Sequence, residues 1–363
     1  MGLGGGGVRR RLLSLRRPDA KGGGYLTGMP VPRKDRPGRA AGFEDLLDRG
    51  VLFLERSGPW PREGVVGLAL SGGADSTFLA LAWREFQARH PGLQGRAWIV
   101  DHRHRADSTE AALRACSLYE GLGLEARVLQ PPAPPERIHE AALRRLRYSL
   151  LEEAAREAGA GILLMAHQAD DQAETLLLRL ARGTGLRGLA GIPAQRWLEG
   201  GVELRRPLLA LRREEIRDCL EDLGQDWIED PTNSDPAGAR RNRVRQELLP
   251  VLAEITHGDP VQALLRLAAE ARSWRDAEDV LLQEAGDWRD LPRYLRCSAL
   301  ADLLTEAGYR VHSAQVHALE RGLHARGSVA VDGEFRVRLE DGRLNLVRRR
   351  DPRHDRRRER SRG

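Results

Sequence analysis

The stretch of sequence that decides the fold covers residues 65–77 and reads VVGLALSGGADST. Its first six residues form a short apolar run rich in valine and leucine, which is typical of a buried β-strand. A serine and two glycines follow, and a helical pattern begins at about Asp75 and continues to Arg89. Glycines let the backbone approach phosphates closely, and the amides at a helix N-terminus favour negative charge. The stretch therefore predicts a strand, a phosphate-binding loop and a helix in succession.

The segments around this loop alternate between short apolar runs and longer amphipathic ones. Further strands are predicted at Ala97–Asp101, Glu125–Leu129 and Gly161–Ala166. Helices are predicted at Phe43–Arg56, Ser108–Gly121, Arg137–Gly159 and Asp170–Arg182. Strands that alternate with helices of this length indicate an α/β fold, a parallel sheet flanked by helices.

The pattern changes after Gly183. A strand-like segment at Val202–Leu209 and a helix at Arg212–Leu223 are followed by a long helical pattern over residues 247–285. Two more helices and a three-stranded meander follow, with turns at Asp332-Gly333 and Asp341-Gly342. We expect residues 43–250 to form the α/β domain and residues 251–347 a second, smaller α+β domain.

Positive charge is concentrated in the two ends of the chain. Residues 1–42 carry ten Lys or Arg and two acids, residues 348–363 carry nine Arg and three acids, and the remainder carries 40 basic and 48 acidic residues. We expect residues 1–42 to be a disordered extension and residues 348–363 to be a basic tail without a defined function. The only two lysines, Lys21 and Lys34, lie in the first segment, which excludes a lysine side chain from any chemistry in the folded body.

The cysteines and apolar runs limit the location of the protein. Cys116, Cys219 and Cys297 lie far apart and form no CxxC pair. A disulfide framework and a cysteine zinc site are therefore not expected, and a reducing cytoplasm fits. The apolar runs are far shorter than the roughly 20 residues that span a membrane, so no membrane association is expected.

The loop at Ser71 differs from two familiar nucleotide-binding loops. It lacks the Gly-Lys-Ser/Thr ending of a Walker A loop. The GxGxxG match at Gly183 follows a predicted helix instead of a strand, so it is not a dinucleotide fingerprint. Asp75, in the first helical turn, either caps the helix or holds Mg²⁺ beside bound phosphates.

Further polar motifs follow the predicted strands and helices in a fixed order. They are residues 100–108 (VDHRHRADS), Arg144, Arg147 and Tyr148 on one helix, residues 166–175 (AHQADDQAET), residues 229–233 (EDPTN) and residues 241–245 (RNRVR). The Ser71 loop resembles that of the N-type ATP pyrophosphatases, also called PP-loop enzymes. The ordered set over about residues 60–250 resembles the tRNA(Ile)-lysidine synthase family.

This resemblance implies a reaction. ATP would activate C2 of the wobble cytidine in the CAU anticodon of tRNA(Ile), and the ε-amine of free L-lysine would displace AMP to give lysidine. It also implies the cofactors ATP and Mg²⁺. A homodimer is left open as the assembly.

The resemblance and the charges together suggest roles for individual residues. The ATP phosphates would be bound by Ser71, Gly72, Gly73, Ala74, Asp75 and Ser76, with Asp75 also a Mg²⁺ ligand. Asp170 or Asp171 would orient the cytidine or accept the lysine proton, while the other caps its helix. Arg144 and Arg147 would neutralise phosphate charge, with a solvated helix face as the alternative.

The remaining arginines are expected to contact RNA. Arg105 matches an arginine of the family, and Arg147 lies on the same helix face as Arg144. Arg241, Arg243 and Arg245 would contact RNA phosphates, far from the phosphate loop. Two alternative functions remain, a PP-loop tRNA thiolation enzyme and a non-catalytic RNA-binding module. The first usually carries a CxxC pair or a catalytic cysteine near the loops.

Overall fold

The computed structural model describes residues 43–103, 107–133, 140–198, 200–229, 240–309 and 312–348. These residues fall into two compact units, which divide after Arg272. The predicted extension, Arg105 and all of the basic tail except Arg348 lie outside the described residues. No helix in the described ranges is long and apolar enough to cross a membrane.

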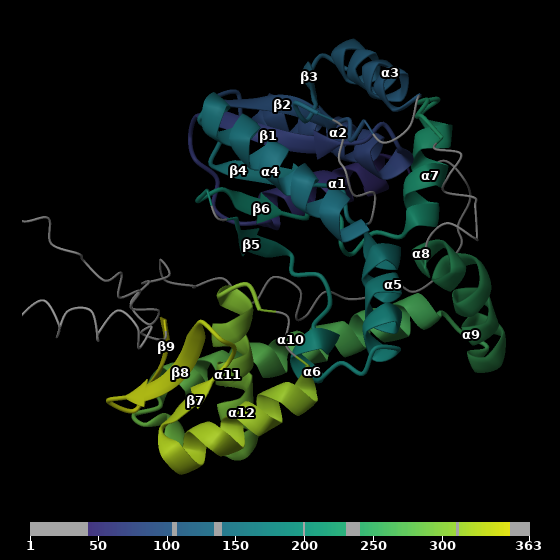
Figure 1. The fold of residues 1–363 in the computed structure, drawn as a ribbon. Helices are drawn as coiled ribbons and strands as arrows, with labels where there is room; N and C mark the ends of the chain where they lie inside the picture. Colours follow the sequence, from purple (N-terminus) through teal and green to yellow (C-terminus); the bar gives the residue numbers. More distant parts are fainter. Residues whose placement is uncertain are drawn as a thin grey trace, which may run out of the picture. The chain divides into compact units, whose positions relative to one another are not determined.

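The first unit is built on a six-stranded sheet (Figure 1). Its strands are β1 Gly64–Leu70, β2 Leu93–Val100, β3 Glu125–Leu129, β4 Ile162–Met165, β5 Gln195–Trp197 and β6 Glu203–Arg205. Their spatial order is β3-β2-β1-β4-β6-β5, and every neighbouring pair is parallel except β5 with β6. The predicted α/β fold with a parallel sheet is confirmed.

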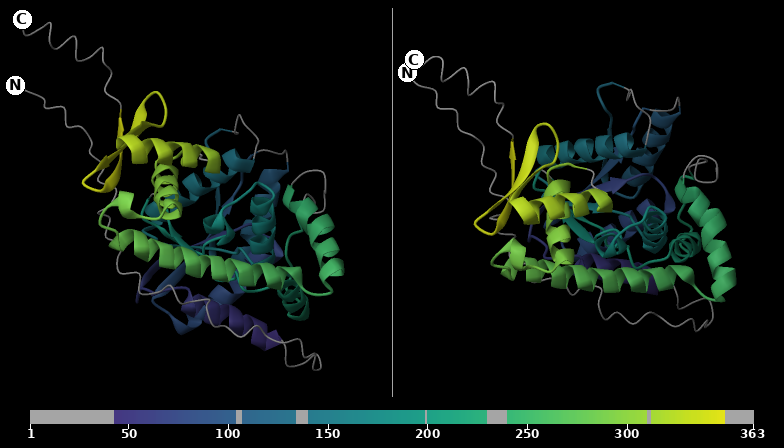
Figure 2. Two further views of the ribbon diagram at one scale, coloured as in Figure 1. Left: turned by 90° about the horizontal axis from the view of Figure 1, so that it is seen from below. Right: turned by 60° about the horizontal axis from the view of Figure 1, so that its bottom comes forward.

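Helices cover both faces of this sheet (Figure 2). One face packs against α1 Phe43–Arg56, α2 Ala74–Arg89, α3 Ser108–Gly121 and α7 Arg213–Asp222, and the other packs against α4 Glu140–Ala158. Successive side chains of a strand point to opposite faces. Accordingly Val66, Leu68 and Leu70 join the first core, while Val65 and Ala69 pack against the second.

The remaining helices of this unit follow the sheet strands or connect them. They are α5 Ala169–Leu180, α6 Leu186–Leu189, α8 Arg240–Arg243, the π-helical turn η2 Val244–Leu248, α9 Leu249–Thr256 and the start of α10 Pro260–Glu284. A capping box begins α5, because the Gln168 side chain accepts from the helix amides and Asp171 accepts from the Gln168 amide.

Three predicted elements differ from the structure. β2 begins four residues earlier than expected, at Leu93. The predicted strand at 202–209 contains only the three residues of β6, which pair with an edge strand, β5, that the sequence analysis missed. The long helical pattern is interrupted at His257, whose φ of 48° is left-handed and ends α9.

One glycine of β1 makes room for a side chain that matters to the site. Trp98 of β2 lies directly over Gly67, and a Cβ built there would be 2.2 Å from the indole ring. No other residue could occupy this position without displacing Trp98.

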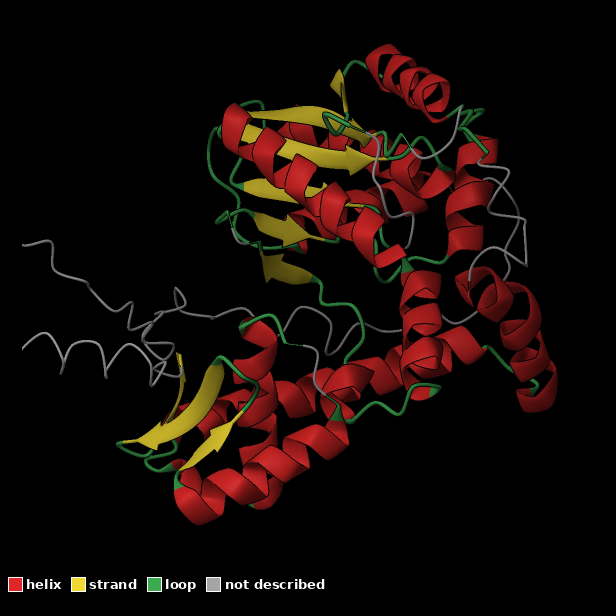
Figure 3. Ribbon diagram, viewed as in Figure 1, coloured by secondary structure: helices red, strands yellow, loops and turns green. Residues whose placement is uncertain are grey.

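The second unit is small and packs two helices against an antiparallel sheet (Figure 3). Its elements are the 3₁₀ turn η3 Trp288–Asp290, α11 Arg293–Glu306, α12 Ser313–Arg326, β7 Ser328–Ala330, β8 Phe335–Glu340 and β9 Arg343–Arg348. The predicted meander and its turn at Asp341-Gly342 are confirmed, with both turn residues at positive φ. Buried Glu320 accepts from Arg296 at 2.9 Å and from Arg293 at 3.3 Å, which ties α11 to α12.

Candidate active site

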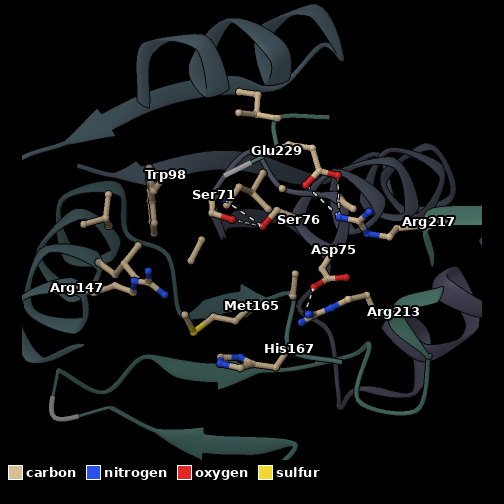
Figure 4. Close-up of a pocket in the computed structure, with 18 of the residues that line it drawn as sticks. Ser71, Asp75, Ser76, Trp98, Arg147, Met165, His167, Arg213, Arg217 and Glu229 are labelled. Carbon is tan, nitrogen blue, oxygen red and sulfur yellow. Dashed lines mark hydrogen bonds and ion pairs between the residues drawn. The ribbon is translucent and has the colours of Figure 1, made fainter. Parts of the chain in front are cut away.

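A cavity of about 270 Å³ opens where the strand order of the sheet reverses. β2 and β3 lie beyond β1, whereas β6 and β5 lie beyond β4. In open α/β sheets such a reversal leaves a crevice at the carboxyl ends of the strands, where ligands bind. Residues that directly follow β1 and β4 line this cavity (Figure 4).

The predicted phosphate loop forms one wall of the cavity. Ser71, Gly73, Ala74, Asp75 and Ser76 all line it. The Ser71 amide donates to Ser76 Oγ at 3.1 Å, and the two serine hydroxyls are also 3.1 Å apart. Gly73 caps α2 without a side-chain hydrogen bond, so no side chain competes for the first amides of the helix. Those amides are therefore donors available to a bound anion.

Gly72 is part of this loop but does not line the cavity. Its amide donates to the Tyr119 hydroxyl at 2.9 Å, and its carbonyl accepts from the Ile228 amide at 2.9 Å. Its φ of 89° is left-handed, and a Cβ there would lie 3.0 Å from that of Ala115. Gly72 thus shapes the loop, and its amide, which we expected to bind phosphate, is instead bonded to the Tyr119 hydroxyl.

Asp75 carries an oxygen without a protein partner. Its Oδ1 is buried and makes no hydrogen bond among the described residues, while Oδ2 lies 3.8 Å from Arg213 Nη2. Burial raises the pKa of Asp75 to about 6, and Asp171 and Asp170 add to this while Arg213 opposes it. Mg²⁺ typically takes one or two carboxylates together with substrate phosphates, so the orphaned oxygen beside an open helix N-terminus fits such an ion.

Asp170 and Asp171 support the site from behind and do not line the cavity. Asp171 caps α5 and lies 3.6 Å from Arg213. Asp170 accepts from Arg212 Nη2 at 3.1 Å and from the Arg213 amide at 2.9 Å. Both carboxylates therefore hold the start of α7, and Asp171 shares Arg213 with Asp75.

Three arginines line the cavity that were not predicted from the sequence to belong to the nucleotide site. Arg213 and Arg217 project from α7, and Arg245 from η2. Arg217 pairs with Glu229, at 2.8 Å and 3.1 Å to the two oxygens. No motif marked Arg213 or Arg217, since a helix predicted far along the chain gave no sign that its first turns would meet the phosphate loop.

The basic run at residues 241–245 does not act as one surface, contrary to expectation. Arg245 lines the cavity and donates to Glu174, which is completely buried, at 2.8 Å. Arg243 pairs with Glu247 on the exposed side of the helix, at 3.0 Å. Arg241 lies near His167 and Arg147, whose pKa values its charge lowers. The run therefore reaches the phosphate loop through Arg245, and the expectation that all three arginines lie far from that loop is wrong for this residue.

The two arginines predicted on α4 occupy different places. Arg147 lines the cavity on the side opposite to Arg213 and Arg217 (Figure 4). Arg144 does not; its Nη2 donates to the Tyr148 hydroxyl at 3.1 Å, and its guanidinium lies 5.1 Å from that ring. Arg196 stacks over the same ring at 4.4 Å. Cationic groups thus surround Tyr148 beside the cavity.

Fold and site together define a PP-loop protein, and residues 53–252 match the family described as PP-loop domain. The chain is 37% identical to a tRNA(Ile)-lysidine synthase from Salinispora tropica, over 79% of this chain and 92% of that protein. It is 34% identical to a tRNA(Ile)-lysidine synthase from Streptomyces coelicolor, over 80% of this chain and 87% of that protein. The chain belongs to the tRNA(Ile)-lysidine synthase family.

A solved structure shows the same fold at low sequence identity. The U34-tRNA thiolase NcsA from Methanococcus maripaludis superposes with a TM-score of 0.53 at 17% identity, covering 68% of this chain and 89% of that one. Membership of the family makes this chain an enzyme, a ligase that forms a carbon–nitrogen bond. ATP is the nucleotide that PP-loop domains use.

Proposed function

We propose that this chain joins free L-lysine to C2 of the wobble cytidine of tRNA(Ile) with a CAU anticodon, at the expense of ATP. The C2 oxygen attacks the α-phosphorus, and the bond to the β-phosphate oxygen breaks to release pyrophosphate. The lysine ε-amine then attacks C2, loses a proton and displaces AMP. Activation converts a poor leaving group into a good one, with ATP supplying the activating group.

The phosphate-loop wall carries this proposal. The open amides of the first turn of α2, the Ser71 and Ser76 hydroxyls and the unpartnered Oδ1 of Asp75 face one cavity. Asp75 would hold Mg²⁺, which would supply charge neutralisation on the triphosphate. Arg213, Arg217 and Arg245 would bind the phosphates that leave, because three guanidiniums on one wall favour a highly charged anion.

The opposite side of the cavity suits the RNA. The side chains of Arg147 and Arg241 form no ion pair or hydrogen bond with another described residue, in contrast to Arg243, which is paired with Glu247. They would contact phosphates near the reacting cytidine, and Arg144 would add charge there. Residues 43–250 would then perform the chemistry, and the smaller domain at 251–347 would grip the tRNA elsewhere.

The thiolation alternative finds no support in the site. Cys116 lies on α3, Cys219 on α7 and Cys297 on α11, and none of them lines the cavity. None of the three is joined in a disulfide within the described part of the chain, which fits the cytoplasmic location that we propose.

The decisive experiment incubates the protein with ATP, Mg²⁺, labelled lysine and a CAU-anticodon tRNA(Ile) transcript. We expect label on the RNA and one AMP released per label. A transcript with uridine at the wobble position is the matched control and should take up none. ATP-dependent sulfur incorporation, or RNA binding without AMP release, would contradict the proposal.

A further inference from the structure

Arg206 is a buried cation whose hydrogen-bond partners among the described residues include no Asp or Glu carboxylate. Only 3% of the residue is exposed. Its Nη1 donates to the Pro193 carbonyl at 2.7 Å, its Nε donates to His167 Nδ1 at 3.2 Å, and it also hydrogen-bonds the Tyr148 hydroxyl. Buried charges in proteins are ordinarily paired with an opposite charge. This arrangement therefore costs stability, and a functional gain is the natural reason for it.

The hydrogen bond from Arg206 determines the protonation of His167. An arginine Nε carries a hydrogen and can only donate, so Nδ1 of His167 must accept. A neutral imidazole that accepts at Nδ1 carries its hydrogen at Nε2. His167 follows β4 and lines the cavity, as Figure 4 shows.

The charges around His167 keep the ring neutral. Burial lowers its pKa well below the usual value, and the guanidiniums that face it add to the effect. They come from the segment after β6, from α4 and from α8, and are Arg206, Arg144, Arg147 and Arg241. A protonated ring would both repel these cations and lose the bond from Arg206.

We propose that His167 is a neutral hydrogen-bond donor, through Nε2, to a phosphoryl oxygen of the nucleotide being transferred, and that Arg206 is the residue that positions it. The inference rests on the proposed function, since the acceptor is taken to be the α-phosphate of ATP. That oxygen gains negative charge as the cytidine attacks, so a fixed donor there stabilises the transition state more than the bound nucleotide. The cytidine C2 oxygen, by contrast, needs its lone pair for attack.

The tautomer can be measured directly in the full-length wild-type protein. Imidazole nitrogens labelled with ¹⁵N report which of them bears hydrogen, and the His167 signal is identified by its loss in His167→Gln. We expect hydrogen at Nε2, none at Nδ1, and no titration between pH 5.5 and 8 (an interval around the ordinary histidine value of about 6.5). Hydrogen at Nδ1, or titration in that interval, would overturn the proposal.

Substitutions test the catalytic half of the proposal. Glutamine keeps a donor near the position of Nε2, whereas alanine keeps none. We expect His167→Gln to lie within about tenfold of wild type in kcat for AMP release, and His167→Ala to lose about 10²-fold, with the Kd for ATP nearly unchanged in both. Equal losses in the two variants, or a loss confined to ATP affinity, would refute donation in the transition state.

The positioning role has a matched control on the same face. Arg206→Met removes the donor that fixes the tautomer, so hydrogen should appear at Nδ1 in part of the His167 population. Arg196→Met removes a neighbouring guanidinium that stacks on Tyr148 without bonding His167, and should leave the His167 spectrum unchanged. Unchanged spectra in both variants would refute the role of Arg206. A wild-type protein that forms no lysidine but shows the expected tautomer would contradict the proposed function and leave the assignment of His167 Nε2–H standing.

Discussion

The phosphate-loop wall of the cavity comes from one short loop, residues 71–76, whereas the arginine wall (Arg213, Arg217 and Arg245) is assembled from α7 and η2. The first wall is shaped mainly by the backbone, through a glycine at left-handed φ and a helix start without a side-chain cap. Two serines whose hydroxyls are bonded to each other complete it. In the second wall, long side chains reach in and are held by carboxylates, as Arg213 is by Asp171 and Arg245 by Glu174. The first kind of wall can be predicted from a contiguous sequence motif. The second cannot, because it depends on how helices that are distant in the sequence pack together.

The largest effect on activity is expected from Asp75, which lies in the phosphate-loop wall and pairs with an arginine of the other wall. Asp75 begins α2 and pairs with Arg213. Replacing it by asparagine removes the carboxylate charge while keeping its size, and should reduce AMP release by about 10³-fold or more, since metal-linked charge stabilisation is worth several kcal/mol. Single-turnover assays with tRNA measure this.

An exposed aspartate provides the control for that substitution. Asp48 on α1 pairs with Arg89 on the surface, at 3.3 Å, and Asp48→Asn should behave as wild type. Turnover near the wild-type rate in Asp75→Asn would remove Asp75 from the nucleotide site.

Replacing Arg245 in the arginine wall should lower the free energy of unfolding as well as the affinity for ATP. Arg245→Ala leaves completely buried Glu174 without its partner, and breaking a buried pair costs about 3–5 kcal/mol. The double variant Arg245→Met with Glu174→Met should regain most of this free energy of unfolding but should still bind ATP about tenfold more weakly. Urea unfolding and nucleotide titration separate the two effects. A double variant with normal ATP affinity would make Arg245 purely structural.

The same contrast explains what sequence reasoning achieved. The β1–loop–α2 unit and the strands β2, β3 and β4 were predictable because each is a contiguous sequence pattern bounded by its own turn residues. β5 was not predicted and β6 was predicted too long, because three-residue strands carry no periodic signal and exist through pairing with each other and with β4. Arg245 looked like part of an RNA-binding run, and only the packing of η2 on α5 brings it to buried Glu174.

Asp75 should set the acid limb of activity. With a pKa of about 6, Asp75 loses its charge as the pH falls through that value, so kcat/KM for ATP should fall there. The stability contribution has the opposite sign, because the folded-state pKa lies above the ordinary value of 3.8. Proton binding therefore favours the fold, fully below about pH 4, and this contribution is lost as the pH rises through about 6.

Removing the Arg213 charge sharpens this expectation. Arg213→Gln should move the limb to higher pH, because the guanidinium favours the carboxylate form of Asp75. The loss at pH 6.5 should be roughly tenfold and smaller at pH 8. Arg217→Gln, which breaks a pair with Glu229 instead, should leave the limb where it is. A limb that stays in place in Arg213→Gln would mean that another group controls it.

The smallest effect on activity is expected from Tyr119, a residue distant in the sequence that supports the phosphate loop. The Tyr119 hydroxyl, buried on α3, accepts from the Gly72 amide at 2.9 Å. Tyr119→Phe keeps the packed ring but leaves the Gly72 amide without its acceptor, which lowers the free energy of unfolding by about 1–3 kcal/mol. Because Gly72 sits between the strand and the cavity-lining amides, we expect the KM for ATP to rise roughly fivefold while tRNA affinity stays constant. Tyr309→Phe removes a comparable hydroxyl bond to Asp332 in the second unit, at 2.7 Å, and should leave the KM unchanged. If Tyr119→Phe lowers only the melting temperature, as Tyr309→Phe should, then the loop keeps its shape without help from α3, and its wall is as self-contained as the sequence motif suggested.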